Sequence, residues 1–115
     1  MKNKRQKRTI LIDLDGVLNT YTGQYDKNTI EEAREGTIEF IKELSIDFDL
    51  KLFTTRPQKL VEKWLNKYNM QDYFSEITNT KKIAWLILDD RCIKFDGNYK
   101  NTITQIKNFK PWYKS

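Results

Sequence analysis

Residues 9–20 read Thr-Ile-Leu-Ile-Asp-Leu-Asp-Gly-Val-Leu-Asn-Thr, and this stretch indicates how the chain folds. A short apolar run ended by a turn signal is typical of a strand buried on both faces of a parallel sheet. Asp13 would then stand where the strand ends, at the edge where open α/β sheets bind ligands. Two acids one residue apart on a strand point to opposite faces, so Asp13 and Asp15 are not both ordinary core positions. If the chain leaves the strand at Asp15, the two carboxylates flank one site.

The pattern Asp-x-Asp-Gly is short, and two other structures compete with this interpretation. A calcium loop needs a third oxygen ligand where this chain has Val17, with the glycine one residue later, so the calcium interpretation fails. A strand followed by a merely acidic turn stays open from this stretch alone. The motifs further along the chain weigh against it.

Composition narrows the class of protein. At 115 residues the chain is long enough for one domain with a real core. No apolar run approaches the length needed to span a membrane, so no membrane partner is expected. A single cysteine, Cys92, excludes an internal disulfide and suits a cytoplasmic location. The chain has no histidine, so a general acid or base must be a carboxylate, lysine, tyrosine or thiol.

The net charge of +5 has a local origin. Residues 1–8 carry five cations and no acid, so residues 9–115 are formally neutral. We therefore divide the chain into a basic N-terminal tail, 1–8, and a single domain, 9–115. A basic tail can hold nucleic acid, but a solubilising tail is the simpler interpretation. Nucleic acid is thus a possible partner only through the tail, and the sequence gives no indication of oligomeric state.

The rest of the chain alternates strands and helices. A capping-box pattern, Thr29-x-x-Glu32, and apolar residues at helical spacing predict a helix over residues 29–44. Pro57 suits the first turn of a second helix, whose apolar face spans residues 60–68. Further strands are expected at 50–53, 76–78, 85–88 and 92–95, and a short final helix at about 103–109. This alternation predicts a central parallel sheet with helices on both faces.

Polar groups follow several of the predicted strands. Because the carboxyl ends of parallel strands meet at one edge of a sheet, we expect these side chains to share a site. They comprise an acid pair after the first strand, a hydroxyl after the second, an amine after the third and an acid pair after the fourth: Asp13, Asp15, Thr54, Lys81, Asp89 and Asp90.

From residue 10 to about residue 109 the chain resembles the haloacid dehalogenase-like (HAD) superfamily. The four motifs of that superfamily match Asp-Leu-Asp-Gly at 13–16, the strand ending in Thr54, Lys81, and the paired acids at 89–90. Lys82 stands where relatives often carry proline, which leaves Lys81 and Lys82 as alternatives; Lys81 keeps Ala84 in register. Residues 54–56 and 89–97 resemble a small-hydrolase branch. The resemblance implies a HAD-like Rossmannoid fold, and the short spacings between motifs leave no room for a cap domain.

This resemblance implies a Mg²⁺-dependent phosphatase, a phosphoric monoester hydrolase that acts through an aspartyl-phosphate. Asp13 would be the nucleophile. Magnesium prefers oxygen ligands, which Asp13 and Asp89 can supply, with the Asp15 backbone carbonyl as a further ligand by resemblance. Thr54 and Lys81 would hold the phosphoryl oxygens. Asp15 would act as general acid and base.

Four further residues are expected at the substrate or behind the metal ligands: Gly16, Thr55, Arg56 and Asp90. Asp90 is interpreted as a supporting acid rather than a direct ligand. A site without a cap suits phosphorylated substrates, small or macromolecular. Two alternatives stay open: a catalytically weak, phosphoryl-binding regulatory protein, and a nucleic-acid end-processing phosphatase.

Overall fold

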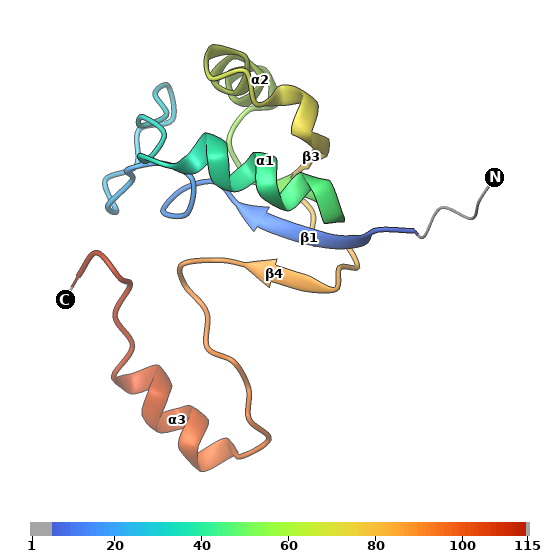
Figure 1. Ribbon diagram of the computed structural model, residues 1–115. Coiled ribbons are helices and arrows are strands. Elements are labelled where there is room, and N and C mark those ends of the chain that lie inside the picture. Colours follow the sequence, from blue (N-terminus) through green and yellow to red (C-terminus); the bar gives the residue numbers. More distant parts are fainter. Residues whose placement is uncertain (1–5, 115) are drawn as a thin grey trace.

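Four parallel strands form one sheet in the order β3-β2-β1-β4 in the computed structural model, which describes residues 6–114 (Figure 1). The strands are β1 (Arg8–Asp13), β2 (Phe48–Phe53), β3 (Phe74–Thr78) and β4 (Leu86–Leu88). The helices are α1 (Thr37–Asp47), α2 (Gln58–Lys67) and α3 (Tyr99–Lys107), with a short 3₁₀ turn at Gln71–Tyr73. The predicted α/β class, with a parallel Rossmann-like sheet and no cap domain, is therefore confirmed.

The register of the sheet brings three strand ends to one edge. Asp13 pairs with Phe53 at the end of β2, and Ile12 pairs with Leu88 at the end of β4. Residues that directly follow β1, β2 and β4 consequently emerge side by side. This places the first, second and fourth motifs at the edge where ligands bind in open α/β sheets.

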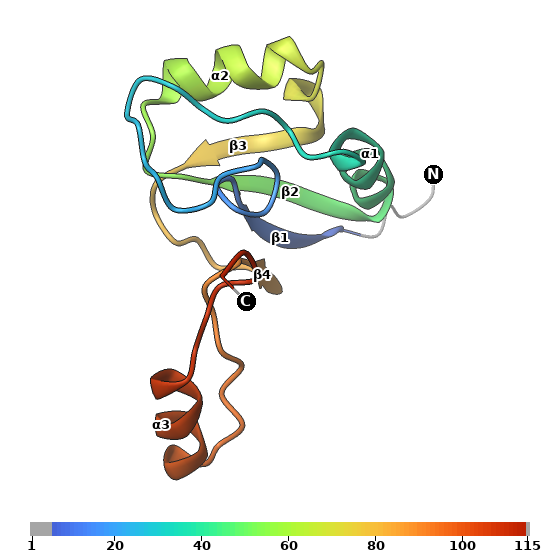
Figure 2. The ribbon, with the colours of Figure 1, turned by 90° about the vertical axis from the view of Figure 1, so that its left-hand side faces the viewer.

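The core lies between one face of the sheet and two helices. Ile10 and Ile12 of β1 are buried together with Ile41 of α1 and with Val61 and Leu65 of α2. Helices were expected on both faces of the sheet, and the layer on this face, formed by α1 and α2, is observed. The third helix, α3, stands away from the sheet in both views (Figures 1 and 2). Its apolar residues Ile103 and Ile106 are accordingly exposed.

The predicted helix over 29–44 is wrong at its start, because α1 begins only at Thr37. Gly36 precedes it with a φ angle of 88°, a left-handed conformation that glycine adopts readily. Upstream of Gly36 the chain pairs with the first loop: Ala33 bridges to Asn19, and Thr20 N donates to Glu32 O at 2.9 Å. Residues 30 and 33 still pack against the core, so their apolar character reflects burial in a loop.

Other predicted elements agree more closely. The second and third strands begin earlier than expected, at Phe48 and Phe74, and the final helix is present as α3, with the Asn98 side chain accepting from Asn101 N at 3.0 Å. Residues 92–95 form no strand, because the chain leaves the sheet after Asp90 and runs out to α3. Cys92, in this segment, is exposed. No helix within residues 6–114 has the length and apolarity that crossing a membrane requires.

The predicted basic tail lies mostly outside the described residues. Its last two residues are held by the domain: Lys7 Nζ donates to Ser45 O at 2.8 Å, and Arg8 opens β1 with its guanidinium 4.8 Å from the centre of the Trp85 ring. Arg8 stands five residues before Asp13, roughly 17 Å along the strand. The described end of the basic segment is thus at the opposite edge of the sheet from the acids.

Gly36→Ala tests where α1 begins. A Cβ at this position meets no atom within 4 Å, so the only penalty is the left-handed backbone, roughly 1–2 kcal/mol for a residue with a side chain. We expect the free energy of unfolding in urea to fall by about 1 kcal/mol. A helix that ran through residue 36 would give the opposite sign, since alanine is a better helix former than glycine by about 1 kcal/mol.

Candidate metal centre

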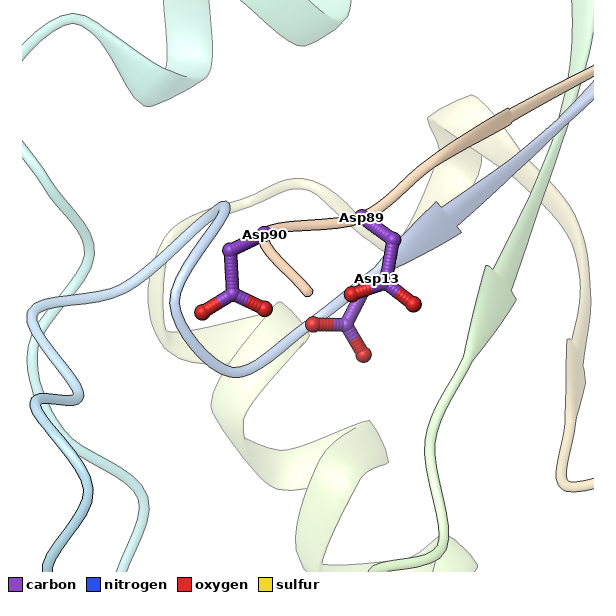
Figure 3. A group of neighbouring side chains, drawn as sticks. All are labelled: Asp13, Asp89 and Asp90. Carbon is purple, nitrogen blue, oxygen red and sulfur yellow. The ribbon is translucent and has the colours of Figure 1, made fainter. Parts of the chain in front are cut away.

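Three carboxylates converge at the carboxyl edge of the sheet. Asp13 ends β1, and Asp89 and Asp90 directly follow β4. One oxygen from each lies within 4.8 Å of the others, and Figure 3 shows the three side chains turned toward one another. The neighbouring positions of β1 and β4 in the sheet produce this arrangement. Asp90, which we expected behind the metal ligands, is one of the three.

Gly16 and Asp90 fit closely together. Gly16 has a φ angle of 89°, and a Cβ built on it would collide with Asp90 Oδ2. Asp90 Oδ2 is buried and has no hydrogen-bond donor among the described residues. A buried carboxylate oxygen without a donor is costly, so a ligand for this atom is expected. The glycine of the first motif therefore provides the space that the Asp90 carboxylate occupies.

Burial and mutual repulsion together set the electrostatics of the acidic cluster. Burial, followed by the charges of Asp89, Asp90 and Asp15, raises the pKa of Asp13 from 3.8 to about 8. Burial and the adjacent Asp89 also raise the pKa of Asp90. A divalent cation would relieve both effects, because it supplies positive charge and accepts carboxylate oxygens as ligands. The residues present therefore fit a hard cation such as Mg²⁺.

Asp15 faces a different set of partners. Its Oδ2 accepts from Arg56 Nε at 2.9 Å, and its Oδ1 accepts from Asn19 Nδ2 at 2.9 Å. The Asn19 Oδ1 in turn accepts from Gly16 N at 3.0 Å. The two acids of the first motif are thus separated in role: Asp13 joins the acidic cluster, and Asp15 is fixed by a cation and an amide.

Arg56 is a structural anchor as well as the partner of Asp15. Its side chain is fully buried. The Nη1 group donates to Asp26 O at 2.8 Å and to Thr29 O at 2.9 Å, and the guanidinium lies 4.7 Å from the centre of the Tyr25 ring. These contacts fasten the loop after the first motif to the turn after β2. Arg56, expected at the substrate or behind the metal ligands, makes these contacts within the protein, and a role toward substrate stays a prediction.

The remaining predicted residues lie around the second and third strand ends. Thr54 is buried; its backbone N donates to Thr78 O at 2.9 Å, and its Oγ1 accepts from Arg56 N at 3.1 Å. Thr55 is exposed and lines, with Thr54, Thr78 and Asn79 among others, a pocket of about 290 Å³.

Lys81 follows the third strand, β3. It is exposed in the connection from β3 to β4, where it makes no hydrogen bond or ion pair with the described residues. Its neighbour Lys82 pairs with Glu76 at 3.4 Å. Lys82 thus forms an ion pair with a residue of β3. The assignment of the motif lysine to Lys81 stays a prediction.

Two residues that support the acids were missed in the sequence. Asn19 is fully buried and hydrogen-bonds three groups of the loop after β1. Its place four residues after Asp15, in a turn that contains glycine, is a signal from which this role could have been predicted. Trp112 Nε1 donates to Gly16 O at 2.8 Å across 96 positions of sequence. No local pattern predicts a contact of that separation.

Comparison with solved structures gives a match over nearly the whole chain. A conserved protein from Bacteroides thetaiotaomicron, named only by its gene locus, aligns with a TM-score of 0.60 and 20% identity, covering 93% of this chain and 95% of that one. At this identity the likeness concerns the fold. No protein-family model and no curated protein matches the chain.

The pH dependence of the metal-free protein follows from Asp13. Its pKa is about 8 in the folded state and near 3.8 in the unfolded state, so the folded state binds the proton more tightly. Protonation of Asp13 therefore contributes its full share to the free energy of unfolding below about pH 4, and this contribution is lost as the pH rises to about 8. With EDTA present, urea denaturation should therefore give a lower free energy of unfolding at about pH 8 than at about pH 5. Asp13→Asn should flatten this slope; an unchanged slope would show that another group causes it.

Proposed function

We propose that the protein is a Mg²⁺-dependent phosphatase that hydrolyses phosphoric monoesters through an aspartyl-phosphate on Asp13. The observation that carries the proposal is the group of three carboxylates at the carboxyl edge of a parallel sheet. The buried, donorless Asp90 Oδ2 within that group favours a cation over a merely acidic turn. The four motifs stand in the sequence in the order found in HAD-like phosphatases, and this resemblance supports phosphoryl transfer as the reaction.

Asp13, Asp89 and Asp90 would hold the ion, with the Asp15 backbone carbonyl as a further ligand by resemblance. Bound there, Mg²⁺ would neutralise charge on the acids and on the phosphoryl group. The exposed Lys81 would add positive charge to the phosphoryl oxygens once substrate is bound. Thr54, whose hydroxyl oxygen accepts from Arg56 N, would hold a phosphoryl oxygen at the base of the site.

Two steps account for turnover. In the first, an Asp13 carboxylate oxygen forms a bond to phosphorus, the bond from phosphorus to the ester oxygen breaks, and Asp15 gives a proton to the departing oxygen. In the second, Asp15 takes a proton from water, water oxygen bonds to phosphorus, and the bond from phosphorus to Asp13 breaks. Phosphate and the original Asp13 carboxylate result.

The ion pair between Arg56 and Asp15 bears on these steps. Arg56 Nε donates to Asp15 Oδ2 at 2.9 Å, so the guanidinium fixes the position of the carboxylate. The second step uses this carboxylate as a proton acceptor. The first step needs a protonated Asp15 unless the leaving group departs without a proton. Aryl phosphates should therefore be better substrates than alkyl phosphates.

The alternatives gain less support. An end-processing role on nucleic acid relied on the basic tail, whose described end, Arg8, opens β1 at the edge opposite the acids. A binding protein without turnover would tolerate the loss of one motif acid, and this chain keeps Asp13, Asp15 and Asp89.

Asp13→Asn should abolish hydrolysis of p-nitrophenyl phosphate in Mg²⁺, because an amide does not attack phosphorus. Release of nitrophenol is the measurement. Asp72→Asn is the matched control, since Asp72 is an exposed acid in the turn before β3, and it should keep wild-type turnover. Acid-quenched wild-type enzyme should carry phosphate that hydroxylamine removes, as acyl phosphates require.

Wild-type turnover by Asp13→Asn would disprove covalent catalysis by Asp13. Mg²⁺-dependent turnover without any trapped phosphate in wild-type and Asp15→Asn enzyme would instead indicate direct attack by water.

A further inference from the structure

The turn at residues 111–114 contacts both loops that carry the acids. This turn is closed by Lys114 N, which donates to Pro111 O at 2.9 Å. Its two aromatic residues, Trp112 and Tyr113, pack edge to face with ring centres 5.5 Å apart. Trp112 hydrogen-bonds the loop after β1 and Tyr113 hydrogen-bonds the loop after β4, so the packed pair connects the two loops.

Trp112 holds the loop of the first motif. Its Nε1 donates to Gly16 O at 2.8 Å, and the Arg34 guanidinium lies 4.5 Å from the centre of its ring. Gly16 is the residue whose missing side chain leaves room for the Asp90 carboxylate. A shift of the Gly16 peptide would therefore press on Asp90 or withdraw from it.

Tyr113 holds the loop after β4. Its hydroxyl accepts from Arg91 Nη2 at 2.6 Å, and Arg91 N donates to Asp89 Oδ1 at 3.1 Å. Arg91 directly follows the acid pair, so its position and that of the Asp89 carboxylate are linked. Through its two aromatic residues the turn spans from the β1 loop to the β4 loop.

We propose that the 111–114 turn is a clamp that sets the spacing of the three acids and so tunes their affinity for a divalent cation. The inference rests on the metal site of the proposed function. Trp112 and Tyr113 are positioning residues, because they contact the loops and not the ligand atoms. Without the clamp, the repelling carboxylates would separate, and more free energy of binding would be spent on bringing them together.

The test is Mn²⁺ binding measured by calorimetry, which needs no substrate. Trp112→Phe keeps an aromatic ring and removes the indole donor, so the Mn²⁺ dissociation constant should rise about tenfold, as on loss of a group that orients metal ligands. Tyr113→Phe should weaken binding in the same direction. Trp85→Phe is the matched control: Trp85 is 55% exposed against 50% for Trp112, and each lies under an arginine. Trp85→Phe should bind Mn²⁺ as wild type does.

A second measurement uses the wild-type chain. The three tryptophans give three indole N–H resonances, and addition of Mg²⁺ should move that of Trp112 while leaving that of Trp85 in place. Equal affinity of Trp112→Phe and wild type, or equal weakening by Trp85→Phe, would overturn the clamp and leave the metal site standing. Absence of Mn²⁺ binding by wild type would overturn the metal site itself, and the clamp with it.

Discussion

Repulsion among three half-buried carboxylates is the constraint on which the site depends. Asp13, Asp89 and Asp90 are brought within 4.8 Å of one another because β1 and β4 are adjacent parallel strands that end at the same edge. Burial of Asp13, together with the charges of its neighbours, makes this arrangement unfavourable unless a proton or a cation compensates it, and these effects raise the pKa of Asp13 to about 8. The Asp90 side chain packs against Gly16, where any side chain would collide with its carboxylate. A fold that maintains such a cluster is suited to binding a cation.

The first motif divides its two acids between two environments. Asp13 belongs to the repelling cluster, whereas Asp15 is paired with the buried Arg56 and with Asn19. Removing one member of a buried ion pair is strongly destabilising, so Arg56 secures the loop as well as the Asp15 carboxylate. Its bonds to Asp26 O and Thr29 O extend this order to the segment that precedes α1. One guanidinium thereby links the end of β2 to the loop that follows β1.

The sequence predicted the parts of the fold that depend on short local patterns. The apolar run before Asp13 and the run before Asp89 are strands whose ends meet, because parallel order follows from alternating strands and helices. The apolar positions of residues 29–36 match a helical period, whereas the left-handed Gly36 and the bridge from Ala33 to Asn19 keep these residues outside the helix. The position of α3 and the bond from Trp112 to Gly16 depend on tertiary structure across long separations, which local periodicity does not encode.

Crystals grown with Mn²⁺ would show whether the three carboxylates bind one divalent cation. Anomalous scattering locates the ion without reference to activity. We expect an anomalous peak bounded by carboxylate oxygens of Asp13, Asp89 and Asp90, each at the short distance typical of an oxygen ligand. The peak should disappear on addition of EDTA. A peak elsewhere on the molecule, or none between these acids at saturating Mn²⁺, would show that the three carboxylates do not form a metal site.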